Sequence, residues 1–274
     1  MKESHVTLGL VLDVSNEDYH SGPGLSRSDL VRLLQSPAHF KLGEEKEQTP
    51  AMVLGQAFHT YTLQSELFDK KFVILPEDYD GRTAKGKALK AEAGDKQTLK
   101  YGEWQDIKGM AEAIRAHPEI ARLLMTGLPE VSGYWYDLAY PEILLKCRVD
   151  WLNLSENIIL DLKSSTEARS EFFTKHAFNF NYHLQAAFYL YVVSTITKTP
   201  HRDFYFAVVE KVKPYGVMLY KATEEFIQAG EIEVQKALAI YADCLAKDEW
   251  PGYSQEVEPL GLPNWKKKRQ QIID

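Results

Sequence analysis

Cysteine is scarce in this chain, which holds only two among its 274 residues, Cys147 and Cys244. Two cysteines are too few for a disulfide framework or for a zinc or iron–sulfur site built from cysteine alone. The chain also lacks an apolar run near the roughly 20 residues that a membrane helix needs, and its N-terminus lacks the apolar core of a signal peptide. We therefore expect a protein of the reducing cytoplasm that is neither exported nor bound to a membrane.

An excess of basic charge is also absent, because 32 lysine and arginine residues stand against 39 aspartate and glutamate residues, for a net charge of −7. This balance excludes a protein coated with positive charge. It does not exclude nucleic acid as a partner, because a DNA channel needs only a local basic surface beside an otherwise acidic exterior.

No internal repeat, low-complexity tract or long linker divides the sequence. The composition, with 45% hydrophobic and 26% charged residues, is that of an ordinary globular protein. We therefore expect a single domain that covers residues 1–274.

Residue patterns predict helices alternating with strands. Helices are expected at 26–36, from Pro50 over PAMVLGQAFHTYTL, at 182–196 and at 223–246. Strands are expected at 131–137, 143–153, 157–163, 204–210 and 216–220. Between them, residues 78–100 are expected to form a mobile, basic, exposed segment with a possible helix near 85–93. This order predicts an α/β fold with a central mixed sheet flanked by helices.

The strongest local signal is the stretch CRVDWLNLSENIILDLKSS, which places Asp150 and Asp161 on two strands joined by a turn. A hairpin centred near Ser155 sets residue 150 opposite 160 or 161, so the two carboxylates become neighbours that could hold one divalent cation. Lys163 emerges on the same face as Asp161, because strand side chains alternate. The alternative is that Asp161 and Lys163 form a simple ion pair at a strand end.

Five ordered motifs, LSRSDLVRLLQSPAHF, LGQAFH, CRVD, ILDLK and YHLQAAFYLY, resemble those of the RecE-type nucleases (exodeoxyribonuclease VIII). The similarity extends more distantly to phage lambda exonuclease, and both belong to the PD-(D/E)xK nuclease superfamily. It runs from DVSNEDYHSGPG to LPNW, which is most of the chain. The resemblance implies a PD-(D/E)xK nuclease core.

The resemblance also implies roles for individual residues. Asp150 and Asp161 correspond to metal-binding carboxylates, the backbone carbonyl of Leu162 to a further ligand, and Lys163 to the lysine that orients or activates water. His59 stands where lambda exonuclease has a helical glutamate and where RecE has a histidine, so it is expected to be a ligand. Without the family, a lone histidine on an apolar helix is more often a packed side chain.

Three further residues are expected near the reacting phosphate. Gln185 and Tyr182 match a glutamine and a tyrosine that flank this phosphate in the superfamily. Ser28 matches a serine that lies near the phosphate of the DNA terminus in lambda exonuclease. Packing on an ordinary helix face is the alternative for Tyr182, and helix capping is the alternative for Ser28.

The expected cofactor is Mg²⁺, with Mn²⁺ able to substitute. One metal position would have mixed nitrogen and oxygen ligands because His59 replaces a glutamate, and imidazole suits transition metals better than Mg²⁺. The two cysteines exclude the branch of the superfamily that carries a four-cysteine iron–sulfur cluster.

The implied function is a bacterial or phage-encoded exodeoxyribonuclease for DNA recombination and repair. It would digest double-stranded DNA from its ends in the 5′-to-3′ direction and leave 3′ single strands for an annealing protein. The family also implies a ring of three or four copies, whose channel Arg82, Lys85 and Lys87 would line. A basic tail at 265–271 could touch phosphates. The alternatives are a structure-specific or restriction-type endonuclease, and a nonhydrolytic DNA-binding scaffold for recombination.

Overall fold

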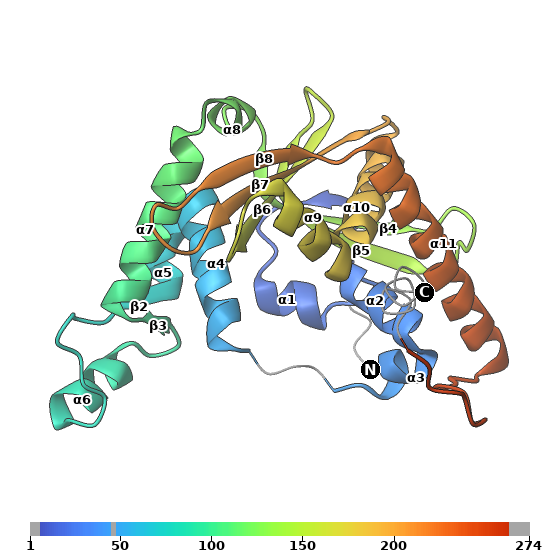
Figure 1. Cartoon of the computed structure of the whole chain (residues 1–274), viewed down its shortest axis with the longest axis horizontal. Helices are drawn as coiled ribbons and strands as arrows, with labels where there is room; N and C mark the ends of the chain where they lie inside the picture. Colours follow the sequence, from blue (N-terminus) through green and yellow to red (C-terminus); the bar gives the residue numbers. More distant parts are fainter. Residues whose placement is uncertain (1–5, 45–47, 263–274) are drawn as a thin grey trace, which may run out of the picture.

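The computed structural model describes residues 6–44 and 48–262, so the basic tail at 265–271 lies outside the described residues. Its centre is a six-stranded sheet with the strand order β1-β4-β5-β6-β7-β8 (Figure 1). The strands are β1 (Gly9–Val11), β4 (Leu128–Tyr136), β5 (Leu144–Asn153), β6 (Ile158–Ser165), β7 (Asp203–Glu210) and β8 (Val217–Lys221). Neighbouring strands are antiparallel except β6 and β7, which are parallel. The predicted mixed sheet is confirmed.

Helices cover both faces of this sheet, and each face has its own hydrophobic core. The first core includes side chains from α2 (Arg27–Gln35), α9 (Ser170–Asn179), α10 (Tyr182–Thr197) and α11 (Glu224–Lys247). The second core includes side chains from α4 (Pro50–Leu63), α5 (Phe68–Lys71), α7 (Tyr101–Ala116) and α8 (Pro118–Leu123). None of the helices within residues 6–44 and 48–262 combines the length and apolar character needed to cross a membrane.

Side-chain caps explain where the predicted helices begin. Ser26, Thr49 and Thr223 precede α2, α4 and α11, and each hydroxyl accepts a hydrogen bond from the backbone N–H three residues on. Such bonds satisfy amides that would otherwise lack a partner in the first helical turn. Pro50 occupies the first turn of α4, where its missing N–H costs nothing.

Several elements were not predicted from the sequence. They are α1 (Asn16–Ser21), α3 (Pro37–Leu42), η1 (Ser65–Leu67), β2 (Phe72–Ile74), β3 (Gln97–Leu99) and the strand and helices β1, α5, α7, α8 and α9 given above. Strands β2 and β3 pair in parallel as a separate small sheet. The basic segment at 78–100 contains α6 (Ala84–Glu92), as expected, and lies at the far end of the small sheet from α2 and α11 (Figure 1).

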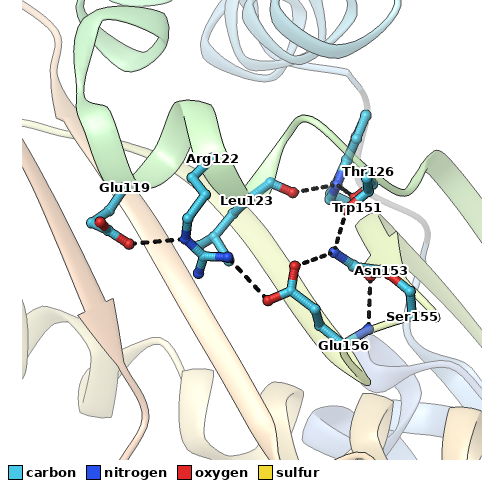
Figure 2. Close-up of polar contacts among 8 residues, drawn as sticks. All are labelled: Glu119, Arg122, Leu123, Thr126, Trp151, Asn153, Ser155 and Glu156. Atoms are coloured by element: carbon cyan, nitrogen blue, oxygen red, sulfur yellow. Dashed lines mark hydrogen bonds and ion pairs between the residues drawn. The ribbon is translucent and has the colours of Figure 1, made fainter.

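A polar network fixes the turn between β5 and β6 against α8 (Figure 2). Arg122 of α8 pairs with Glu156 in the turn at 3.0 Å. The Asn153 amide donates to the Thr126 hydroxyl at 2.9 Å, and its oxygen accepts from the Glu156 backbone N–H at 3.0 Å. The Trp151 indole donates to the Thr126 carbonyl at 3.2 Å. One end of the hairpin is therefore held from both its backbone and its side chains.

Beyond this turn, β5 and β6 separate. They pair only from Asn153↔Ile158 to Trp151↔Leu160. From there β5 continues beside β4 as far as Tyr136↔Leu144, whereas β6 continues beside β7 as far as Ser165↔Glu210. The register would next set residue 150 opposite 161, which is one of the two partners that the sequence allowed. Asp150 and Asp161 therefore lie where the two strands diverge, which we call the strand fork.

Arg148 of β5 joins the N-terminal motif DVSNEDYH to the sheet. Its guanidinium donates to the Asn16 side chain at 2.6 Å and to the Val14 carbonyl at 2.8 Å. The same group lies 4.3 Å from the ring centroid of Tyr19. Two motifs that are more than 100 residues apart therefore form one structural unit.

The packing of α11 on α10 gives a test of the fold. A Cβ on Gly230 of α11 would lie 2.0 Å from the backbone oxygen of His183 in α10, whereas a Cβ on Gly102 of α7 would meet no atom within 4 Å. We predict that Gly230→Ala lowers the free energy of unfolding by about 1–3 kcal/mol through overpacking. Gly102→Ala should leave it unchanged or raise it by up to about 1 kcal/mol, because alanine favours helix. Urea denaturation measures both, and equal effects would contradict the close approach of the helices.

Candidate functional site

Asp150 occupies the middle of the strand fork and contacts both β6 and α4. Its Oδ2 accepts a hydrogen bond from the backbone N–H of Leu162 at 2.8 Å. The same oxygen lies 3.4 Å from Nδ1 of His59 on α4. The structure thus joins the LGQAFH and CRVD motifs at one carboxylate.

Asp161 is almost fully buried, with 2% of its side chain exposed, and both of its oxygens have partners. Gln185 of α10 donates to Oδ2 at 2.6 Å. The Lys163 ammonium contacts Oδ1. Neighbouring Leu160 and Leu162 point into the second core, so alternation directs Asp161 to the α10 side of the sheet.

Lys163 lies between Asp161 and the ring of Tyr182. Its Nζ is 4.7 Å from the centroid of that ring, close enough for a cation–π contact. Tyr182 in turn stacks on Phe206 of β7, with centroids 5.7 Å apart. Tyr182 is therefore a packed residue that also contacts the lysine, and its role beside the reacting phosphate stays a prediction.

Glu130 of β4 also lies in the site, and sequence reasoning missed it. Pro129↔Trp151 and Val131↔Val149 flank it in the ladder, so Glu130 stands opposite Asp150. One ligand atom from each of His59, Glu130 and Asp150 falls within 4.8 Å of the other two. The predicted strand began at residue 131 and so excluded Glu130. Extending the β4–β5 register by one residue would have found it.

Burial and mutual charge shift the pKa values of these groups. Burial would lower the pKa of His59, but the Asp150 carboxylate outweighs it and raises the pKa to about 9. Burial, together with the charge on Asp150, raises the pKa of Glu130 to about 7. Burial raises the pKa of Asp161 to about 6 despite Lys163. Burial opposes ionisation of Asp150, but His59 and Lys163 overcome it and lower its pKa.

The donor set fits a divalent cation. Glu130 and Asp150 offer carboxylate oxygens and His59 an imidazole nitrogen, which together suit Mn²⁺ and similar ions. Burial is the main cause of the raised pKa of Glu130, and repulsion by the Asp150 carboxylate adds to it. Asp161 was expected in the same ligand set, and its oxygens instead contact Gln185 and Lys163. Its role as a ligand stays a prediction, as does that of the Leu162 carbonyl.

Ser28 lies in the exposed first turn of α2. Ser26, not Ser28, caps this helix, so the capping alternative does not explain Ser28. Its neighbour Arg27 donates to the carbonyls of Phe180 and Asn181, directly before Tyr182. The start of α2 is therefore anchored beside the start of α10, and contact of Ser28 with a phosphate stays a prediction.

Arg82, Lys85 and Lys87 are not brought into the strand fork. They lie on or beside α6, at the far end of the small sheet (Figure 1). Arg82 pairs with Asp80 at 3.0 Å, and Lys85 with Asp78 at 3.7 Å. Adjacent carboxylates thus neutralise part of this basic surface.

We predict that Mn²⁺ binding depends on both His59 and Glu130. Loss of a supporting residue around a metal ligand typically weakens binding about 10–100-fold, so His59→Ala and Glu130→Gln should each weaken it at least 10-fold. Calorimetric titration with Mn²⁺ gives the affinities, and His39→Ala, which removes an imidazole from α3, is the matched control. A His59→Ala variant that melts at a lower temperature but binds Mn²⁺ normally would assign His59 to packing alone.

The fold was compared with solved structures. A crystal structure described as a "putative exonuclease" from Eubacterium rectale matches with a TM-score of 0.57 and 14% identity, covering 90% of this chain and 97% of that chain. The structure of SSO0001 matches with a TM-score of 0.31 and 11% identity over 73% of this chain and 89% of that chain, which is too weak to support an argument. The first likeness shows a shared fold.

No curated protein matches the sequence significantly. A family model does match residues 26–262, and it describes a PDDEXK-like domain of unknown function (DUF3799). This range includes every residue of the strand fork, from His59 to Gln185. Because the match covers most of its length, the chain belongs to this family of PDDEXK-like domains.

Proposed function

We propose that this protein is a metal-dependent nuclease that hydrolyses phosphodiester bonds in DNA. The observation that carries the proposal is the strand fork, where Asp150, Asp161 and Lys163 meet. His59 from α4 and Gln185 from α10 approach the same point from opposite faces of the sheet. Membership of a PDDEXK-like family and the shared fold support this conclusion.

Glu130, Asp150 and His59 would hold the cation. A bound divalent metal supplies Lewis acidity at a phosphoryl oxygen and lowers the pKa of a bound water. The chain's part is to keep these three ligand groups together before metal binds. The Leu162 N–H fixes Asp150, and the β4–β5 ladder fixes Glu130 opposite it.

Lys163 supplies positive charge at the site. Burial opposes its charged form, but Asp161 and Asp150 raise its pKa, so it carries a proton at neutral pH. An ammonium group there can orient the attacking water and stabilise the charge that grows on the phosphate oxygens. Gln185 holds Asp161, and Asp161 holds Lys163, so Gln185 acts as a positioning residue.

The finer proposal is a 5′-to-3′ exonuclease of double-stranded DNA that leaves 3′ single strands for recombination by strand annealing. It rests on the resemblance to RecE-type nucleases, which also assigns Ser28 to the phosphate of the DNA terminus. A ring of three or four copies, a channel lined by Arg82, Lys85 and Lys87, and an annealing partner stay predictions from that resemblance.

We predict that Asp161→Ala abolishes hydrolysis and lowers the melting temperature, because it leaves the buried Lys163 ammonium without its partner. Lys163→Ala should lower kcat about 100- to 1,000-fold, the usual cost of losing one group that stabilises transition-state charge. The matched control is Asp203→Ala, because Asp203 and Lys221 form an exposed Asp–Lys pair on the same sheet at 2.8 Å. Near-normal nuclease activity of Asp161→Ala would overturn the site assignment.

We predict that linear duplex DNA labelled at a 5′ end loses its label at once in Mg²⁺, whereas a 3′ label is retained until late, and that chelation stops both. Covalently closed circular DNA should stay intact because it has no end. Cleavage of the circle would identify an endonuclease instead. Binding without hydrolysis in Mg²⁺ or Mn²⁺ would identify a nonhydrolytic scaffold.

A further inference from the structure

An exposed pair of stacked rings stands at the end of α9. Phe180 is 55% exposed, although it is a large apolar side chain. Its ring stacks on His176, with centroids 4.3 Å apart and planes inclined by 23°. The stack leaves much of the phenyl surface in water, where it has no structural partner to bury it.

The backbone beneath these rings is held in place. The Phe180 N–H donates to the His176 carbonyl at 3.0 Å. Arg27 of α2 donates to the carbonyls of both Phe180 and Asn181. The exposed ring is therefore presented from a fixed position.

Tyr182 connects this pair of rings to Lys163 in the strand fork. Tyr182 lies 6.2 Å from Phe180 and 5.8 Å from His176, measured between ring centroids. Tyr182 also contacts the Lys163 ammonium, which lies 4.7 Å from its ring centroid. A ligand bound at Lys163 would thus lie one aromatic ring away from the Phe180–His176 stack.

Two cationic side chains lie beside this aromatic series. Lys163 contacts the ring of Tyr182, and Arg27 donates to the carbonyls of Phe180 and Asn181. Burial, followed by the charges of Lys211 and Lys163, lowers the pKa of His176, so its ring is neutral at pH 7. Aromatic rings beside cationic side chains are a combination that binds single-stranded nucleic acid, with phosphates on the cations and bases on the rings.

We propose that Phe180, supported by His176, is a stacking platform for an unpaired nucleobase next to the phosphate that lies at Lys163. The inference rests on the proposed nuclease function. It adds that the DNA strand being cut is unpaired where it enters the site. A duplex has no free base face within its length, so the platform engages a frayed end or a single strand.

Equilibrium binding of a fluorescein-labelled single-stranded oligonucleotide to the full chain in EDTA, where hydrolysis is stopped, tests the platform. Stacking of one base on an aromatic ring corresponds to about a 5- to 150-fold gain in affinity, so Phe180→Ala should lose that factor and Phe180→Trp should keep it. An abasic site moved along the oligonucleotide should weaken wild-type binding at one position. Phe180→Ala should show no further loss there.

Phe178→Ala is the matched control. Phe178 is 59% exposed but stacks on His183, with centroids 4.9 Å apart, and not on the series that leads to Lys163. It should bind like the wild type. Wild-type affinity in Phe180→Ala, or a loss that does not depend on the abasic position, would overturn the platform. A parallel Mg²⁺ digestion separates the two proposals, because a wild-type chain that neither binds nor hydrolyses DNA would overturn the nuclease function itself.

Discussion

The arrangement of the site depends on the point where β5 stops pairing with β6. After Trp151↔Leu160 the edge of β6 loses its backbone partner, and a buried N–H without a partner is costly. Asp150 resolves this cost, because its carboxylate accepts from the Leu162 N–H in place of a β5 carbonyl. The Asp150 carboxylate thus stabilises the fork and also contacts His59. One side chain serves both the local structure and the chemistry of the site.

The fork also explains why charged groups tolerate burial here. Three carboxylates, Glu130, Asp150 and Asp161, face two cationic side chains, His59 and Lys163. Burial raises the pKa of Glu130 to about 7, and repulsion by the Asp150 carboxylate adds to that rise. A divalent cation would complete the balance and relieve this repulsion. The cluster is therefore better suited to binding a cation than to adding stability on its own.

Sequence reasoning found β4 to β8 of the central sheet, but not β1. It also found most of the fork, because IILDLKSS carries both a strand pattern and a charge that an apolar strand does not need. It missed Glu130, whose position depends on the register of a second hairpin. It also missed α7, although Ile107, Met110, Ala111 and Ile114 are buried at helical spacing. Local sequence patterns do not predict that β5 and β6 separate. The separation arises because β5 continues to pair with β4, whereas β6 continues to pair with β7.

Because β6 and β7 are parallel, the segment that connects them positions both Gln185 and Phe180. Parallel neighbours need a crossover, and here α9 and α10 form it. The crossover bends at Asn181, which has a left-handed backbone (φ 55°) and precedes α10. That bend starts α10 so that Gln185 reaches Asp161, and it leaves Phe180 at the outer end of α9 with its ring in solvent. The exposure of Phe180 thus follows from the same turn that brings Gln185 to Asp161.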